Sequence, residues 1–246
     1  MIGLGLNTAA DTSHPALFGG LPAETQNYSA YLDGASDRIQ GANLATTWLK
    51  VWGANQPFSL HFSINLDALN QTISFTGTTA NFLWFSVDAA GKLQVYGGLS
   101  SSAVGLENWT TNLSTGTWYD IVITSTNDTS RDLKCYVNKV EKSAATAIPW
   151  AASHDMAAIS GKFSIGTLLN AVDADFKIDR LASWSSVLTS AEITEIYDNY
   201  PDLTADSGNY VSSSDLETYY KIEEGSGTTM SDSSGNSNGD LTVINA

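Results

Sequence analysis

Apolar and polar residues alternate along much of the chain, which is the pattern of β-strands with one buried face. The clearest run is 58–64, where Phe58, Leu60, Phe62 and Ile64 fall on one side. Turn residues bound most of these runs, and short strands between turns are typical of an all-β protein. Further strand patterns cover residues 28–32, 38–40, 72–75, 82–87, 92–96, 118–124, 132–138, 162–166, 176–184, 216–222 and 241–244.

One segment has a helical period instead. Thr189 and Glu192 fit a capping box, in which each residue's side chain satisfies the other's backbone N–H. Apolar residues then recur at spacings of three and four up to Tyr200, and Pro201 ends the run. A helix this short is unstable alone, so we expect it to pack against the sheets.

These elements predict an all-β fold, an antiparallel sandwich of two sheets with one short helix. We expect an N-terminal arm over residues 1–27 and a β-sandwich over 28–201. Residues 202–246 form a linker and a C-terminal strand segment that completes the same sandwich.

The charge of the chain narrows the classes of partner. It carries 26 acidic residues against 11 basic ones, a formal net charge of -15, which disfavours nucleic acid. No apolar run reaches the length of a membrane span, and the first residues show no signal peptide. The single cysteine, Cys135, lies in a strand pattern, where we expect a buried small residue.

A further series of segments carries motifs in a fixed order along the chain: 27–39, 57–62, 114–122, 133–139, 163–166 and 178–198. In this order they resemble the strands of laminin-G-like, concanavalin A-like jelly rolls. The resemblance implies a jelly-roll form of the sandwich. Two positions depart from the family pattern, with Lys139 in place of a turn glycine and Arg180 in place of an acidic residue.

The segment 219–239 is similar to one that usually begins such domains, but here it comes last. Tails of this kind resemble those of bacteriophage structural proteins. This resemblance implies a virion protein, made in the host cytoplasm, that decorates a capsid or belongs to a tail or fibre. Its partners are then other virion proteins, met as a homo-oligomer or by docking through residues 1–27.

The alternative is a carbohydrate-binding, lectin-like module. The chain has seven tryptophans. Trp84, Trp118 and Trp184 fall in strand patterns, and we expect them in the core. Four others lie near turns, where an exposed ring binds a glycan or anchors an interface. These candidates are Trp48, Trp52, Trp109 and Trp150.

We expect no enzyme, and a glycoside hydrolase or lyase is the weakest of the alternatives. Glycosidases of this fold need two facing carboxylates, and no strand pattern carries the family's Glu-x-Asp motif. The three histidines, His14, His61 and His154, lack the spacing of a metal site. His61 alternates with apolar residues, so we expect it on a sheet face or in solvent, and a Ser-His-Asp triad stays open.

Calcium is the one cofactor that the sequence leaves open, since related jelly rolls bind it through loop Asp and Asn side chains. Asp173, Asp175 and Asp179 are the candidate ligands. Asp33 with Asp37 is a second acidic group, and a third follows Asp232. The competing interpretation is that these side chains cap turns, and we favour it.

Overall fold

The computed structural model describes most of the sandwich. The described residues are 29–34, 37–41, 57–77, 82–99, 102–126, 133–148, 162–166, 174–236 and 239–244. The predicted arm at 1–27 lies outside them. Among the described residues, no helix has the length and apolar character needed to cross a membrane.

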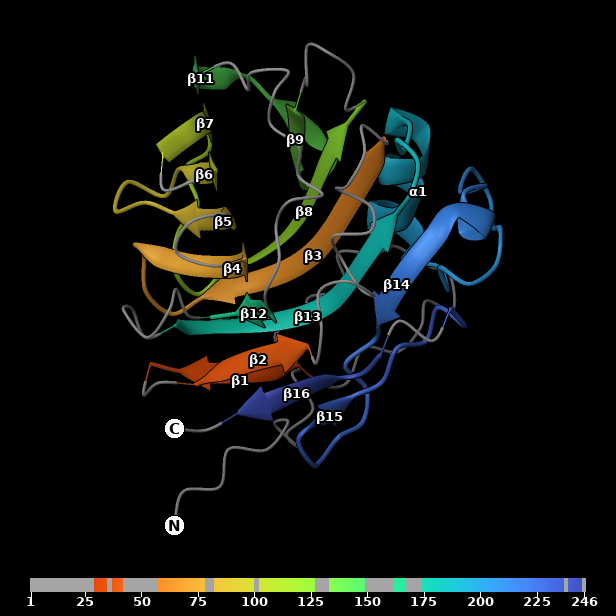
Figure 1. Ribbon diagram of the computed structural model, residues 1–246. Coiled ribbons are helices and arrows are strands. Elements are labelled where there is room, and N and C mark those ends of the chain that lie inside the picture. The colour runs from red at the N-terminus through yellow and green to blue at the C-terminus, as the bar shows by residue number, and fades with distance from the viewer. Residues whose placement is uncertain are drawn as a thin grey trace.

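The described strands form two antiparallel sheets that face each other, as Figure 1 shows. Sheet A has the order β1-β13-β3-β8-β9-β10, with β14 also paired to β13. Its strands are β1 (Ala30–Asp33), β3 (Phe58–Leu66), β8 (Trp118–Ser125), β9 (Leu133–Val137), β10 (Val140–Lys142), β13 (Asp175–Trp184) and β14 (Leu216–Tyr220).

Sheet B has nine strands in the order β11-β7-β6-β5-β4-β12-β2-β16-β15. Its strands are β2 (Arg38–Gly41), β4 (Gln71–Gly77), β5 (Phe82–Val87), β6 (Leu93–Leu99), β7 (Ser102–Trp109), β11 (Ala144–Ile148), β12 (Lys162–Ile165), β15 (Thr229–Met230) and β16 (Leu241–Ile244). The predicted all-β jelly-roll sandwich with one helix is therefore confirmed.

The main core lies between the sheets and follows from the alternation in the sequence. Phe58, Leu60, Phe62 and Ile64 of β3 all point into it and are at most 3% exposed. Cys135 is buried there as well, as expected of a small residue in a strand. Each inward side chain leaves its strand neighbours on the outer face of the sheet.

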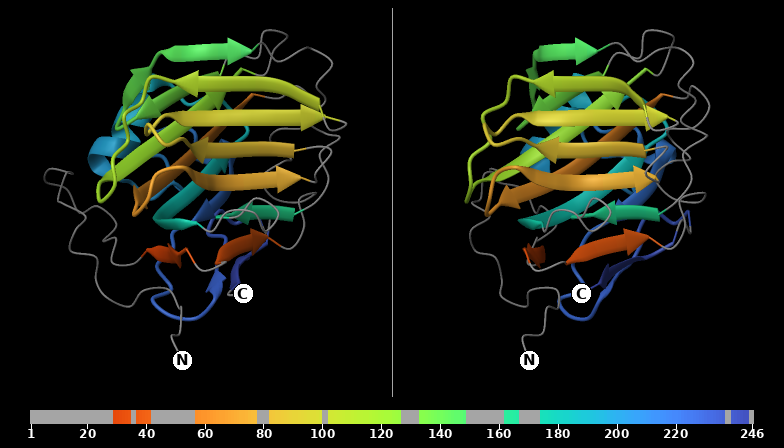
Figure 2. Two further views of the ribbon diagram at one scale, coloured as in Figure 1. Left: turned by 90° about the vertical axis from the view of Figure 1, so that its left-hand side faces the viewer. Right: turned by 60° about the vertical axis from the view of Figure 1, so that its left-hand side comes forward.

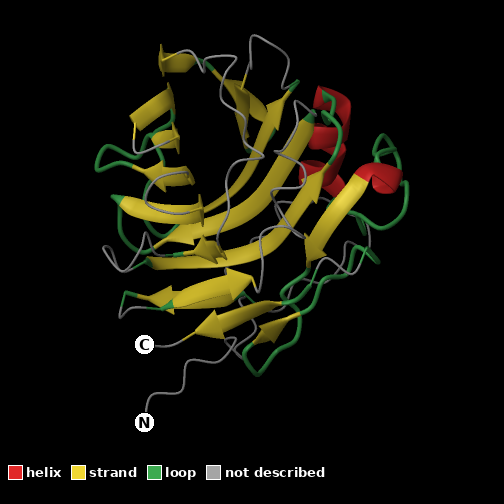
Figure 3. Cartoon of the chain, in the orientation of Figure 1, coloured by secondary structure: helices red, strands yellow, loops and turns green. Residues whose placement is uncertain are grey.

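Helix α1 (Ser190–Asn199) covers the outer face of sheet A, as Figure 3 shows in red. Both hydrogen bonds of the predicted capping box between Thr189 and Glu192 are present. Ile193 and Ile196 are fully buried in a second apolar cluster with residues of β13, including Trp184. The sequence thus placed this helix correctly, and packing supplies the stability that its length cannot.

The C-terminal segment contributes to both sheets. Strand β14 pairs with the second half of β13, beside the part that β1 occupies. Strand β16 pairs with β2 in sheet B. Between α1 and β14, Leu203 and Tyr210 are fully buried, so this stretch is packed rather than a free linker. A 3-10 helix, Ser213–Asp215, leads into β14.

The two departures from the family pattern both adopt a left-handed backbone. Asn138 and Lys139 have φ of 49° and 61° and form the tight turn between β9 and β10. Arg180 has a φ of 48° and sits at the register shift of β13 between Asp179 and Leu181. Such conformations are uncommon outside glycine, so the surrounding contacts must hold them in place.

Candidate functional site

The outer faces of the two sheets differ in what covers them. Helix α1 and the segment after it lie against the outer face of sheet A (Figure 1). Among the described residues, no helix or strand covers the outer face of sheet B, which Figure 2 shows with β4 to β7 turned toward the viewer. Each face carries its own group of polar or aromatic side chains.

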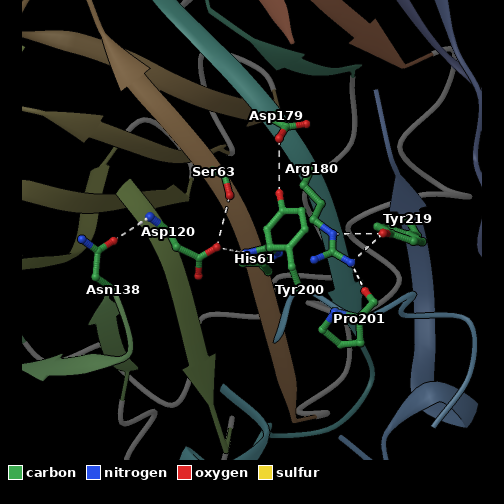
Figure 4. A network of polar contacts seen from close by, with 9 residues as sticks. All are labelled: His61, Ser63, Asp120, Asn138, Asp179, Arg180, Tyr200, Pro201 and Tyr219. Carbon is green, nitrogen blue, oxygen red and sulfur yellow. Dashed lines mark hydrogen bonds and ion pairs between the residues drawn. The ribbon is translucent and has the colours of Figure 1, made fainter. Parts of the chain in front are cut away.

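The covered face of sheet A holds a pair of buried polar side chains, drawn in Figure 4. Nε2 of His61 lies 2.6 Å from Oδ2 of Asp120, and Ser63 Oγ donates to the same oxygen at 3.2 Å. Asn138 Oδ1 accepts from the backbone N–H of Asp120 at 2.9 Å. His61 is fully buried, so it lies on a sheet face as expected but is shielded from solvent.

This arrangement does not form a nucleophilic triad. A triad requires the serine hydroxyl to bond the histidine, which then removes its proton. Here the hydroxyl of Ser63 bonds Asp120, and Nδ1 of His61 has no hydrogen-bond partner. The group is best explained as a polar patch enclosed beneath α1, because a buried charge needs such partners.

A second buried group centres on Arg180, also shown in Figure 4. Its Nε and Nη2 donate to the hydroxyl of Tyr219 at 2.9 and 2.8 Å, and Nη2 also donates to the carbonyl of Pro201. The guanidinium carbon lies 3.7 Å from the ring centre of Tyr200, the residue that ends α1. Arg180 thereby joins β13 to the end of the helix and to β14.

Asp179 is the acidic member of this second group. It is fully buried and accepts a hydrogen bond from the hydroxyl of Tyr200 at 3.2 Å. Burial raises the pKa of Asp179 well above its usual value, although the guanidinium of Arg180 acts in the opposite direction. The contacts of Asp179 and Arg180 therefore hold the end of α1 and β14 on sheet A, and both polar groups are buried.

The open face of sheet B carries an aromatic pair. Trp84 of β5 and Tyr96 of β6 are direct cross-strand neighbours, and both are half-buried. Their ring centres are 5.3 Å apart and their planes differ by 28°, so the rings stack. Phe85 and Val95, their neighbours in sequence, point into the core, which directs Trp84 and Tyr96 outward.

Polar side chains with oxygen atoms adjoin the aromatic pair. Gln94 precedes Tyr96 by two residues on the same face of β6, and Asn108 of β7 lies directly opposite it. Gln94 Nε2 donates to Oδ2 of Asp88 at 3.4 Å. Asn108 Oδ1 and Trp84 Nε1 are buried atoms without a hydrogen-bond partner.

The tryptophan predictions need two corrections. Trp109 was a candidate for ligand contact, but it is 1% exposed in the main core. It ends β7, a strand that the sequence pattern did not reveal, and alternation along β7 turns its ring inward. Trp84 was expected in the core and instead lies on the outer face of sheet B, whereas Trp118 and Trp184 are buried. The candidates Trp48, Trp52 and Trp150 lie outside the described residues.

The predicted calcium ligands do not come together. Asp175 and Asp179 are four residues apart on β13, about 13 Å along a strand. Asp179 is enclosed beneath Tyr200 and unavailable to an ion. Among the described residues, no three His, Cys, Asp or Glu side chains are grouped to hold a metal. Asp173 lies outside the described residues, and calcium binding elsewhere stays a prediction.

Two of the other acidic residues, Asp37 and Asp232, accept hydrogen bonds from backbone N–H groups. Asp37 is 1% exposed and accepts from the backbone N–H of Asp33. Asp232 Oδ1 accepts from the backbone N–H groups of Tyr219 and Ser234. Backbone groups that lack a partner in a ladder are commonly satisfied in this way.

Comparison with known proteins agrees with the architecture. The chain matches a laminin G family model described as the concanavalin A-like lectin/glucanases superfamily, over residues 33–194. No curated protein sequence matches it. None of these comparisons supports the predicted virion role, and they favour the lectin-like alternative.

Solved structures with the same fold are distant in sequence. A Bacteroides ovatus protein named as a candidate carbohydrate binder has 20% identity and a TM-score of 0.55, over 87% of this chain and 57% of its own. The heptameric SAP-like pentraxin of Limulus polyphemus has 13% identity and a TM-score of 0.50, over 88% of this chain and 94% of its own. The chain thus spans little more than half the length of the Bacteroides protein. The family match covers more than half of the chain, and the chain therefore belongs to the concanavalin A-like lectin/glucanases superfamily.

Proposed function

We propose that the protein is a non-catalytic carbohydrate-binding module that holds a glycan on the outer face of sheet B. The observation that carries this proposal is the stacked pair of Trp84 and Tyr96 on a sheet face that no described helix or strand covers. Aromatic rings present apolar surface to the C–H face of a sugar at low cost in conformational entropy. Asn108 and Gln94 supply the polar atoms that orient a ligand in such sites.

The comparisons support the same function. The Bacteroides ovatus protein is named for carbohydrate binding, and the superfamily takes its name from lectins as well as glucanases. The glucanase half of that name requires facing carboxylates. Among the described side chains beside the pair, Ser86, Gln94 and Asn108 carry no carboxylate, and Asp88, which Gln94 contacts, is a single one. The expectation that the chain is no enzyme stays a prediction.

The virion hypothesis has less support. It depended on the tail at 219–239 and on docking through residues 1–27. The described part of the tail is explained by its pairing with β13 and β2, and residues 1–27 lie outside the described residues. Virion partners, a homo-oligomer and virion localisation therefore stay predictions.

The test is binding of the purified chain to a panel of polysaccharides and a glycan array, with calcium and with EDTA. Trp84→Ala and Tyr96→Ala each remove one ring of the pair, and we expect each to weaken binding about tenfold. Tyr31→Ala is the matched control, because Tyr31 is half-buried on the outer face of sheet A. We expect this variant to bind as the wild type does.

Two results would overturn the proposal. One is a wild-type protein that binds no member of the panel under either condition. The other is binding that survives both substitutions in the pair, which would place the glycan elsewhere. Binding lost in EDTA and retained by Trp84→Ala would point to a calcium-dependent site outside sheet B.

A further inference from the structure

Asp179 and Arg180 form a seam on one edge of β13, where the first strand of sheet A meets the C-terminal segment. Along this edge, β13 pairs with β1 up to Ile178 and with β14 from Leu181 onward. Asp179 and Arg180 are the two residues between these points, and both are fully buried. On the opposite edge, against β3, the register shifts at the same two residues. The attachment of β14 therefore begins beside a buried acid and a buried base.

Contacts from three elements converge on this seam (Figure 4). At the end of α1, the Tyr200 hydroxyl donates to Asp179 at 3.2 Å, and the Tyr200 ring centre lies 3.7 Å from the guanidinium carbon of Arg180. On β14, the Tyr219 hydroxyl accepts from Arg180 at 2.8 and 2.9 Å. Glu223, just beyond β14, acts on the charge of Asp179. When the C-terminal segment moves away from β13, the contacts that cross the seam must break.

The seam holds two carboxyl groups and one guanidinium. Burial raises the pKa of Asp179 well above its ordinary value of 3.8, and the carboxylate of Glu223 raises it further. The guanidinium of Arg180 opposes this change without cancelling it. Lys221, the cation between β14 and Glu223, forms an ion pair with Asp202. Asp179 therefore keeps its proton to a higher pH in the closed structure than in water.

The other groups around Asp179 are neutral or acidic. Ser63, its partner on β3, is uncharged. Burial and the adjacent Asp179 raise the pKa of the Tyr200 hydroxyl well above 10, so this group stays a neutral donor. Asp120 of β8 acts on Tyr200 in the same direction. Asp179 is thus the group of the seam whose ionisation responds to pH.

Opening of the seam changes the ionisation of Asp179. Once water reaches the side chain, its pKa returns toward 3.8. Between pH 3.8 and the raised value, the open form releases a proton that the closed form retains. Linkage then makes the equilibrium constant for opening rise about tenfold for each pH unit in this range. The stabilisation is fully present below pH 3.8 and is lost as the pH rises through the raised pKa.

We infer that Asp179 is a pH-sensitive latch, whose protonated carboxyl group keeps the C-terminal segment closed on sheet A and whose ionised form lets it open. Rising pH then releases β14 from β13. The opening is local, because β3, β8 and β13 remain paired with one another. The latch acts on the covered face of sheet A and does not depend on the glycan site proposed for sheet B.

Native-state hydrogen exchange of the whole chain tests the latch, followed by NMR between about pH 5 and about pH 8. Protection factors are corrected for the intrinsic exchange rate at each pH, so they report the opening equilibrium. The amides of β14, Leu216–Tyr220, should lose protection about tenfold per pH unit until the raised pKa of Asp179 is reached. At each pH they should be less protected than the amides of β8, because β14 opens before the whole domain unfolds.

Three variants assign the effect. Asp179→Asn has a similar shape and no titrating proton, so the protection of β14 should not change with pH. Glu223→Gln removes a charge that raises the pKa of Asp179, so the loss of protection should end at a lower pH. Asp202→Asn is the matched control, because hydrogen bonds lower the pKa of Asp202 to about 2 and it stays ionised throughout the range. It should leave the slope unchanged.

Several results would overturn the inference. One is a wild-type protein whose β14 amides keep the same protection across the pH range. A second is a folded Asp179→Asn variant that retains the slope. A third is equal protection of β14 and β8 at each pH, which would mean that the C-terminal segment opens only with global unfolding. Should Asp179→Asn fail to fold, an unshifted pH profile in Glu223→Gln would overturn the latch by itself.

Discussion

The outer faces of the two sheets differ in whether other elements cover them. Sheet A buries its outer face beneath α1 and the C-terminal segment, and the polar side chains there, such as His61 and Arg180, are fully enclosed. Sheet B leaves its outer face open among the described residues and places the half-buried Trp84 and Tyr96 on it.

The difference teaches that the polarity of a residue does not reveal its role in this fold. A His–Asp pair, of the kind found in active sites, lies buried between two strands of sheet A. A buried arginine links β13 to β14 and to the end of α1. Aromatic residues of the kind found in cores lie on the surface of sheet B. The comparison therefore predicts large losses of stability from changes on the outer face of sheet A and small ones from changes on sheet B.

The largest effect should follow from Arg180→Leu. This change leaves the buried hydroxyl of Tyr219 and the carbonyl of Pro201 without their donor, and leaves Asp179 without its adjacent positive charge. Removing one member of a buried charged group costs about 3–5 kcal/mol, so urea unfolding should show a loss in that range. A loss below about 1 kcal/mol would mean that Arg180 does not fasten the C-terminal segment. Arg38→Leu, a half-buried arginine on β2, is the control.

A smaller effect is expected at the start of α1. Thr189→Ala removes the side chain that accepts from the backbone N–H of Glu192 at 3.2 Å. Loss of such a cap costs about 1 kcal/mol, which the midpoint of urea unfolding measures. Glycan binding at sheet B should be unchanged. A parallel loss of binding would show that the two faces are coupled.

The pair of Asp202 and Lys221 should make a smaller, pH-dependent contribution. Burial alone would raise the pKa of Asp202, but hydrogen bonds from Thr204 and Lys221 lower it to about 2, below the ordinary value of 3.8. A lowered pKa contributes stability above pH 3.8 that is lost as the pH falls toward 2. Because the Asp202 side chain is 44% exposed, solvent screening limits the effect to below about 1 kcal/mol.

Asp202→Asn tests this contribution. The variant should be less stable than the wild type near pH 7 and equal to it near pH 2, as measured by urea unfolding across that range. Lys221→Met should give a similar loss near pH 7, and the double variant should add little to either. A difference that persists at low pH would assign the effect to packing rather than charge.

The smallest loss of stability is expected on sheet B. Tyr96→Ala removes one half of a cross-strand aromatic pair on the open face, which contributes about 0.5 kcal/mol. The same substitution should weaken glycan binding strongly. Thermal unfolding should therefore show a small change in stability, whereas titration should show a large loss of affinity. A loss of stability as large as that of Arg180→Leu would remove the contrast between the two faces.

Much of the fold followed from local patterns. The alternation at 58–64, the strand patterns at 82–87 and 92–96 and the capping box at Thr189 each correspond to an observed element. Strands β7, β10, β11 and β15 were not predicted. Their sequences lack a clear period of two residues, and β10 and β15 are only three and two residues long. Such strands are defined by their partners across the sheet rather than by their own sequence.

The candidate site was harder to predict. Trp84 and Phe85 are adjacent in a strand made mostly of apolar residues. Such a strand gives no sign in its sequence of which of its two faces points into the core. The pairing of β5 with β6 shows which face is inward. Phe85 and Val95 are paired and lie in the core, so Trp84 and Tyr96 point outward. Polar Gln94, one residue before Val95, was the one signal in the sequence that marked the outer face of β6.

The sequence by itself determined the fold class, the helix with its cap and the family, because alternation and capping act between near neighbours along the chain. Only the tertiary structure decided which face of each sheet is covered. That choice depends on where α1 and the C-terminal segment pack, which contacts distant in sequence determine. The same packing encloses His61, Asp120 and Arg180, whereas Trp84 and Tyr96 stay half-buried on the outer face of sheet B.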